Sequence, residues 1–248
     1  MLTALSDRIG EYRAATPRAG TWTLQELHDS YLLFSDGLIT VVYAPVDYVN
    51  VEARILLLGI TPGLQQAQIA FKTQYAMRGA SVEAAGREIK RRAAFAGMMR
   101  RNLITMLGDL GVHTLLGVKS ADALFAEHAE LLHSTSALRY PVFKNRKNYS
   151  GHSPEPVRHE CLAWMLEHML APEISAVPNA LIVPLGRTVE RVLDHLTARG
   201  LVGEGRWLRG FPHPSGANGH RKMIFEKNRE ALRSAARSWL QAQQPPRY

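Results

Sequence analysis

The sequence is poor in cysteine, in long apolar runs and in acidic residues relative to basic ones. Its single cysteine, Cys161, excludes an internal disulfide and a four-cysteine iron–sulfur cluster. The setting HECLAWMLEHML has the spacing of an amphipathic helix, so we expect Cys161 to be a small core residue rather than a nucleophile. No apolar run approaches the roughly 20 residues of a membrane span, and the first residues, MLTALSDRIGEYR, do not resemble a signal peptide. We therefore expect a cytoplasmic protein that contacts no membrane.

Basic residues are in surplus: 30 Lys and Arg against 22 Asp and Glu give a formal net charge of +8. Such a surplus favours a polyanionic partner, because neutralising phosphates releases condensed counterions. A basic enzyme without a polyanionic partner can have the same composition. The charge alone leaves both interpretations open.

The chain has 248 residues, 46% of them hydrophobic, which is enough for one domain with a sizeable core. No internal repeat, low-complexity segment or linker interrupts it. We predict a single domain over residues 1–248, with an N-terminal helical extension over 1–36 and a flexible tail over 242–248. The second helix of that extension is predicted over TWTLQELHDSYLLF.

Predicted strands and helices alternate along the chain. The strands are predicted at 38–44, 53–60 and 179–186, within 130–143, and as a short last strand within 206–212. The helices are predicted at 81–111 with a break at Gly97, at 156–170, at 187–200 and at 225–241, with a polar loop over 144–156. This alternation predicts an α/β fold in which helices cover both faces of a parallel sheet.

Three predicted strands end in unusual sequences. GITPG (59–63) follows one strand, SALRYP (136–141) a second, and HPSGANG (213–219) the last. Ligands of such folds bind beyond the carboxyl ends of the strands, where the strand order reverses. We expect these three segments to converge on one crevice.

GITPG and HPSGANG, in this order and separation, resemble the two motifs of the uracil-DNA glycosylase superfamily. The phrase GITPGLQQAQIAF is most similar to the mismatch-specific branch, in which an aromatic residue occupies the position of Phe71. ALIVPLGRTVERVL resembles the strand–Gly–helix segment that precedes the second motif. The resemblance implies a three-layer α/β/α sandwich around a short parallel sheet. It also implies removal of a damaged base, which is flipped out of the DNA stack into a pocket.

The resemblance assigns catalytic roles to His213 and Thr61. His213 would donate a hydrogen bond to the oxygen of the departing base, where negative charge develops. Thr61 stands where members commonly carry Asp, Asn or Glu, and would hold the attacking water. A threonine hydroxyl can donate and accept a hydrogen bond, but it is no base at neutral pH. A plain turn-capping role for Thr61 stays open.

A second group of residues would bind the base. Backbone groups of the first motif would approach it closely, and Phe71 would stack on it, unless Phe71 is an ordinary core aromatic. Either Ser136 or Asn148 would read the edge of the base; an amide pairs a donor and an acceptor with a uracil-like edge, and a hydroxyl discriminates less. These base-binding residues are Gly59, Ile60, Pro62, Gly63, Phe71, Ser136 and Asn148.

The second motif and the residues after it would contact the DNA. The expected DNA-binding residues are Ser215, Gly216, Asn218, Arg221 and Lys222. Many members carry a bulky apolar wedge just past this motif, and the sequence GANGH has none. Single-stranded or already destabilised DNA is therefore the favoured substrate.

Metal chemistry is not indicated. His152 and His159 have no Cys or carboxylate cluster at ligand spacing around them. We expect neither a metal nor another cofactor, and a monomer with DNA as its partner.

Three functions fit these observations. The first is a DNA-repair glycosylase that hydrolyses the N-glycosidic bond of a uracil-like or otherwise modified base. The second is a relative that no longer hydrolyses and binds modified bases or nucleic acid. The third is a doubly wound enzyme that acts on a small nucleotide.

Overall fold

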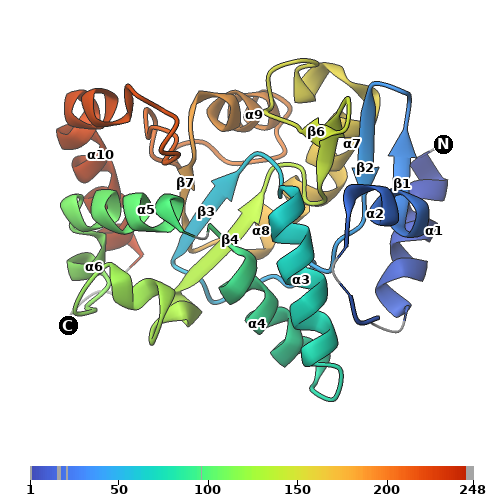
Figure 1. Ribbon diagram of the computed structural model, residues 1–248. Coiled ribbons are helices and arrows are strands. Elements are labelled where there is room, and N and C mark those ends of the chain that lie inside the picture. Colours follow the sequence, from blue (N-terminus) through green and yellow to red (C-terminus); the bar gives the residue numbers. More distant parts are fainter. Residues whose placement is uncertain (1, 16–17, 21, 96, 244–248) are drawn as a thin grey trace. The chain divides into compact units, whose positions relative to one another are not determined.

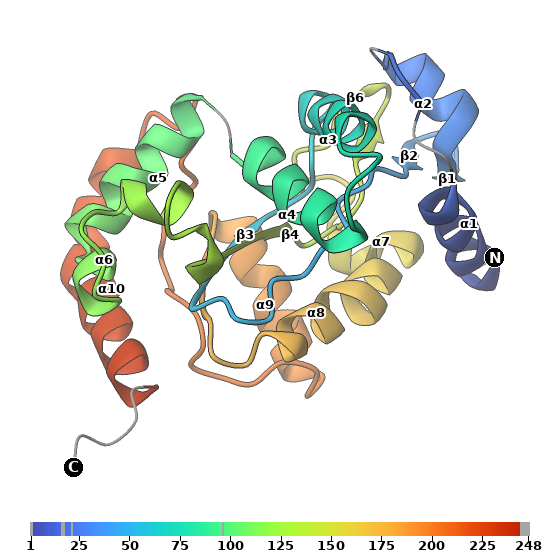
Figure 2. The same cartoon turned by 90° about the horizontal axis from the view of Figure 1, so that it is seen from below.

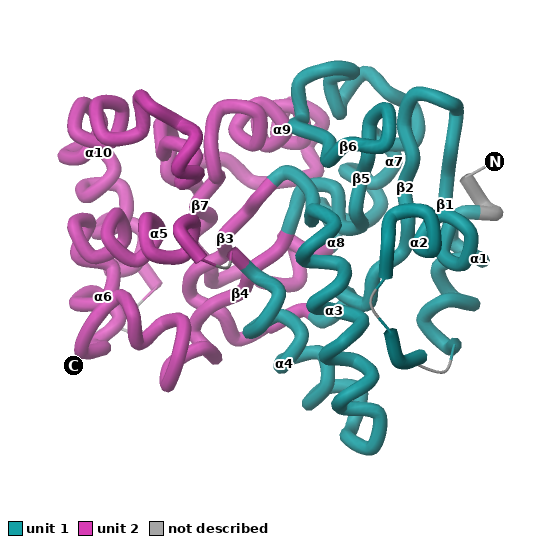
Figure 3. Tube along the Cα trace, in the orientation of Figure 1, with its two compact units in different colours: residues 1–48, 60–94, 136–172 teal, residues 49–59, 95–135, 173–248 magenta. Residues whose placement is uncertain are grey.

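The computed structural model describes residues 2–15, 18–20, 22–95 and 97–243 (Figure 1). The chain divides into two compact units, each built from three separated segments (Figure 3). Unit 1 comprises residues 1–48, 60–94 and 136–172, and unit 2 comprises residues 49–59, 95–135 and 173–248. The predicted single domain stays a prediction. From residue 244 on, the predicted tail lies outside the described residues.

Unit 1 contains an antiparallel four-stranded sheet with the order β1-β2-β5-β6. Helices from the same unit accompany it. Its elements are α1 (Leu2–Ala14), α2 (Leu24–Tyr31), β1 (Leu32–Ser35), β2 (Ile39–Val42), α3 (Leu64–Ala76), α4 (Val82–Ala93), β5 (Val142–Lys144), β6 (Lys147–Asn148), the 3-10 helix η3 (Pro156–Arg158), α7 (Glu160–Met165) and the π-helix η4 (Leu166–Leu170).

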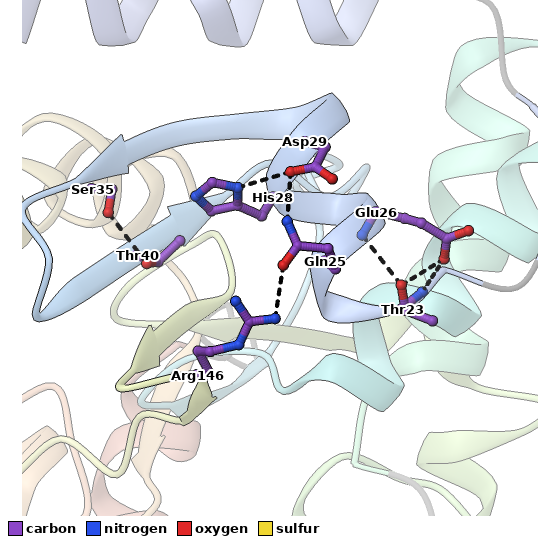
Figure 4. Close-up of polar contacts among 8 residues, drawn as sticks. All are labelled: Thr23, Gln25, Glu26, His28, Asp29, Ser35, Thr40 and Arg146. Carbon is purple, nitrogen blue, oxygen red and sulfur yellow. Dashed lines mark hydrogen bonds and ion pairs between the residues drawn. The ribbon is translucent and has the colours of Figure 1, made fainter.

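Polar contacts fix the start of α2. The Thr23 hydroxyl accepts a hydrogen bond from the Glu26 backbone, and the Glu26 carboxylate accepts one from the Thr23 N–H at 2.7 Å, a reciprocal capping box. Next to this cap, Arg146 of the β5–β6 turn donates to Gln25 at 2.8 Å (Figure 4). The hairpin and the helix are thereby joined inside unit 1.

An aromatic cluster forms part of the core of unit 1. Phe71 lies 4.7 Å from Tyr31 and 5.3 Å from Trp22, measured between ring centroids, and Tyr43 lies 6.5 Å away. All four rings are less than 9% exposed. Residues of the N-terminal extension therefore pack directly against α3.

Unit 2 contains a three-stranded sheet with the order β4-β3-β7. Strands β3 and β7 pair in parallel from Ile55–Leu181 to Leu58–Pro184. The elements are β3 (Ile55–Gly59), α5 (Met98–Asp109), α6 (Val112–Leu115), the 3-10 helices η1 (Asp122–Phe125) and η2 (Ala129–Leu131), β4 (Leu132–Ser136, whose last residue starts a segment of unit 1), α8 (Ala171–Ala176, which begins at the end of unit 1), β7 (Leu181–Pro184), α9 (Arg187–Ala198) and α10 (Arg221–Ala242).

The strands at the centre of this sheet are buried throughout. Every residue of β3 and β7 is buried, as the continuous apolar runs predict for strands covered on both faces. Helix α9 buries Val189, Val192 and Leu196 at helical spacing, and it contacts β7, as α10 does. Gly200, at a φ of +69°, closes α9 as predicted.

Several sequence predictions of local structure were wrong or incomplete. Residues 32–35 form β1 instead of the end of a helix, because they pair with β2. Helix α3 was missed. The predicted loop over 144–156 contains β6, and Asn145 and Arg146 both have positive φ, as type I′ hairpin turns require. The predicted last strand is reduced to an isolated parallel bridge between Trp207 and Ile182.

Other local predictions are confirmed. Cys161 is fully buried, and burial raises the pKa of its thiol to about 12, so it is a core residue. The long helical stretch is broken between α4 and α5, with Gly97 at a φ of +65°. On α4, Arg91 and Arg92 both pair with Glu88. In the described part of the chain, no helix is both long and apolar enough to cross a membrane.

Candidate functional site

The first motif begins at the carboxyl end of β3. The strand is buried up to Gly59, and the chain then enters unit 1. There the carbonyl of Ile60 accepts a hydrogen bond from the Leu138 N–H at 2.8 Å. This bond holds the first motif against the segment that follows β4.

The Thr61 hydroxyl forms hydrogen bonds with two backbone groups, and we call this pair of bonds the Thr61 tie. Its Oγ1 donates to the carbonyl of Tyr140 at 3.1 Å and accepts from the Val142 N–H at 3.0 Å. A hydroxyl has one proton and two acceptor sites, so one acceptor site is left. The geometry gives Thr61 a definite positioning role, and only the remaining acceptor site could accept a hydrogen bond from a water molecule.

Tyr140, one partner of the Thr61 tie, also takes part in a polar network around Asp47 in unit 1. The Tyr140 hydroxyl donates to Asp47 at 2.6 Å, and the Tyr43 hydroxyl donates to the other carboxylate oxygen at 3.1 Å. Arg13 pairs with Asp47 at 2.7 Å. Burial, followed by the Asp47 charge, raises the pKa of both tyrosines well above their ordinary value, so they stay neutral donors. A cavity of about 730 Å³ adjoins this network and is lined by none of the predicted site residues.

Asn148 lies against the end of the first motif. Its Oδ1 accepts from the Leu64 N–H, the first residue of α3, at 3.1 Å. A Cβ placed on Gly63 would lie 3.2 Å from Nδ2 of Asn148, a tight contact, so a residue without a side chain fits this position best. The loop carrying Asn148 therefore folds back over this motif, as one of the two predicted alternatives requires.

Ser136, the other predicted base reader, ends β4 and is half-buried. No hydrogen bond joins its side chain to another described residue. Both predicted alternatives lie near the first motif: Asn148 contacts Gly63 and Leu64, and Ser136 lies two residues before Leu138, whose N–H donates to Ile60.

The stacking role predicted for Phe71 is wrong. Its ring is 2% exposed and is enclosed by Trp22 and Tyr31. A base could not reach its face without displacing these rings. The prediction failed because the spacing from the second glycine places Phe71 on the buried side of α3.

His213, in unit 2, has a defined tautomer. Its Nδ1 accepts a hydrogen bond from the Ser215 N–H at 3.2 Å, so the proton of the neutral ring is on Nε2. Pro214 has no N–H, which makes Ser215 the first residue able to supply this bond. Burial lowers the pKa of His213 below its ordinary value and favours the neutral ring. No described residue hydrogen-bonds Nε2.

Gly186 sets the position of His213. A Cβ on Gly186 would lie 3.0 Å from the His213 Cβ, and its backbone, at φ +93° and ψ 169°, is in a region that only glycine adopts readily. Gly186 follows β7, and the Leu185 N–H donates to Leu58 of β3 at 2.9 Å. His213 therefore lies at the same carboxyl edge of the sheet in unit 2 as Gly59.

The loop after His213 is closed by its own polar groups. The Asn218 side-chain amide donates to the His213 carbonyl at 3.1 Å, and the Ser215 Oγ accepts from the Ala217 N–H at 3.2 Å. Arg221, the first residue of α10, donates to the Ser215 carbonyl at 2.7 Å. These bonds hold Ser215, Asn218 and Arg221 of the predicted DNA-binding residues in the loop around His213, with Gly216 exposed.

Helix α5 supports this loop from outside the motif. Its Asn102 donates to the Pro214 carbonyl at 2.7 Å. Helices α5 and α10 lie side by side (Figures 1 and 2) and enclose a cavity of about 260 Å³, which Lys222 helps to line. Asn102 was missed because nothing in a helical stretch signals a partner 112 residues away. Gly186 was noticed only as part of a strand–Gly–helix segment.

Comparisons with known proteins agree with the motifs. The family model described as "Uracil DNA glycosylase superfamily" matches residues 46–241. A curated relative, "Uncharacterized protein YoxB" from Bacillus subtilis (strain 168), is 37% identical over 217 residues, which cover 86% of this chain and 85% of the relative. No solved structure matches the chain significantly. The family match confirms the resemblance and the predicted α/β/α fold class.

Proposed function

Because the chain belongs to the uracil-DNA glycosylase superfamily, we propose that it hydrolyses the N-glycosidic bond of a uracil-like or otherwise modified base in DNA. The observation that carries this proposal is the Nε2–H of His213, held as a donor by the Ser215 N–H on the opposite nitrogen. The protein would act as a cytoplasmic monomer in DNA repair, with no metal or other cofactor.

The proposed reaction places charge where His213 can stabilise it. The bond between the sugar C1′ and the base nitrogen breaks, and its electron pair stays on the base. The Nε2–H donates to the base oxygen that gains this charge, in a half-buried position where such a bond is worth more than in water. Water adds to C1′ and releases a proton.

The first motif provides the proposed contacts with the base. Backbone groups from Gly59 to Gly63 approach the base, and Asn148 reads its edge through the amide that lies over Gly63. Thr61 acts mainly as a positioning residue, since its hydroxyl ties Tyr140 and Val142 to this motif. Gly59, the first residue of this motif, lies at the same sheet edge in unit 2 as His213.

The second-motif loop provides the proposed DNA contacts. The Ser215 Oγ accepts one hydrogen bond and keeps its proton for a phosphate, and Lys222 is exposed beside Arg221. Gly216 and Asn218 complete the surface next to His213. The loop itself carries no apolar wedge, so its composition favours single-stranded or destabilised DNA.

A second candidate is a non-hydrolytic protein that binds modified bases. The engagement of the Thr61 hydroxyl in two backbone bonds favours it, because the first motif then offers no side chain to activate water.

An oligonucleotide panel separates the two candidates. Uracil, hypoxanthine, xanthine and a bulkier modified base are placed in single-stranded and duplex DNA, and abasic sites are measured under single-turnover conditions. A glycosylase releases at least one base, and His213→Ala slows that release. Salt-sensitive binding without abasic sites on any substrate would support the non-hydrolytic candidate.

A further inference from the structure

An exposed methionine lies against the second-motif loop. Met98 is the first residue of α5, and 55% of its surface is exposed. A Cβ placed on Gly216 would lie 3.6 Å from the Met98 Cγ, which is van der Waals contact. Met98, Gly216 and His213 all belong to unit 2 (Figure 3).

The position of Met98 relative to His213 is fixed by α5. Met98 and Asn102 are one helical turn apart, so they share a face of the helix. Asn102 donates to the carbonyl of Pro214, the residue after His213. One face of α5 therefore contacts the loop through Asn102 and lies close to Gly216 through Met98, so the exposed side chain is held next to the loop that carries His213.

The chemistry of this side chain is that of a wedge. Apolar groups, methionine among them, insert between bases and compensate for unstacking. The thioether is long, unbranched and polarisable, which suits contact with base faces. An Nη of Arg101 lies 3.7 Å from the Met98 sulfur, and this exposed cation can bind the phosphate next to an inserted side chain.

We propose that Met98 enters the base stack of duplex DNA and fills the space left by the flipped nucleotide. The inference rests on the proposed glycosylase function and extends it from single-stranded to duplex substrates. The small residues Gly216 and Ala217 leave room for a side chain from α5 to take this place.

The test compares single-stranded and duplex substrates that carry the same base. Single-turnover rates are measured for the parent, Met98→Ala, Met98→Leu and Met223→Ala. Met223 is the matched control, an exposed methionine of the same unit on α10, with 64% of its surface accessible. Met98→Ala should lower the duplex rate about tenfold and leave the single-strand rate unchanged, because flipping costs a few kcal/mol only in a stacked duplex. Met98→Leu and Met223→Ala should retain both rates.

Two outcomes would overturn the proposal: an unchanged ratio of duplex to single-strand rates in Met98→Ala, or an equal loss of that ratio in Met223→Ala. If the parent releases no base from either substrate, the glycosylase function fails instead. The wedge is then tested with 2-aminopurine next to a stable abasic analogue in a duplex. The parent should raise its fluorescence by unstacking it and Met98→Ala should not; an equal rise with both proteins refutes the role of Met98.

Discussion

The backbone N–H of Ser215 donates to Nδ1 of His213 at 3.2 Å, which directs the only proton of the neutral ring to Nε2. Three consecutive residues, His-Pro-Ser, suffice for this arrangement. The reactivity that we propose for the site depends on it.

Removing the Nε2–H donor of His213 should slow base release without preventing DNA binding. A donor aimed at developing charge contributes about 10²–10³ in rate, so His213→Ala should lose about that much. The measurement is single-turnover release from the best substrate of the panel. His220→Ala, at an exposed histidine just past the same loop, is the control and should keep the parent rate. Full activity in His213→Ala would refute the assignment.

The pH dependence should follow the neutral ring of His213. Burial lowers its pKa, so protonation sets in only below the ordinary value of about 6.5. The added proton leaves the Nε2–H in place, but Nδ1 then carries a proton and can no longer accept the hydrogen bond from the Ser215 N–H that orients the ring. The folded state binds this proton less readily than the unfolded chain. The stability contributed by the neutral ring is therefore complete above pH about 6.5 and falls as the pH decreases toward the lowered pKa. The acid limb of kcat/KM should have its midpoint below 6.5; a midpoint above this value contradicts the prediction.

Alanine substitutions at two glycines with positive φ, Gly186 and Gly200, distinguish the effect of backbone strain from the effect of displacing His213. Gly186→Ala should lower the free energy of unfolding by about 1–3 kcal/mol and also slow base release, because the new Cβ meets His213. Gly200→Ala introduces a left-handed alanine with nothing within 4 Å, so it should cost about 1–2 kcal/mol and keep the rate. Equal rates in the two variants would show that the contact with Gly186 is unimportant.

Thr61 should matter more for stability than for chemistry. Thr61→Val leaves the Val142 N–H and the Tyr140 carbonyl without their partner and should cost about 1–3 kcal/mol in urea unfolding. Thr61→Ser keeps the hydroxyl and should retain both stability and base release. A Thr61→Val protein as stable as the parent would mean that the tie contributes nothing.

The contact with DNA should depend on salt. Lys222→Glu should weaken oligonucleotide binding and reduce the slope of log K against log salt by about 1, the loss of one phosphate contact. Lys119→Glu makes the same charge change at another exposed position of unit 2 and should have a smaller effect. Binding that does not respond to salt would support an enzyme acting on a small nucleotide.

The sequence predicted the parts of the structure that depend on neighbouring residues. The continuous apolar runs predicted β3 and β7, and Gly97 and Gly200 marked helix boundaries correctly. The two motifs predicted the family because each is a short contiguous stretch that can be recognised in the sequence without knowledge of the fold. Asn148 could be proposed as a base reader from its loop, and the structure places it at Gly63.

Contacts between distant segments could not be predicted in this way. Phe71 has the spacing of a site residue, but Trp22 and Tyr31, at least 40 positions earlier, cover its ring. Asn102 reaches Pro214 only because α5 packs on the loop. Nor does a threonine at position 61 reveal that its hydroxyl will bind the backbone at Val142.

The aromatic cluster also defines how far the protein can be shortened. Residues 1–36 are predicted from the sequence to be an extension, yet the rings of Trp22 and Tyr31 pack against Phe71. A truncated protein that begins at β2 would expose the Phe71 ring to water and create an apolar surface that promotes aggregation. For expression and crystallisation, a minimal version of this protein therefore has to start before Trp22.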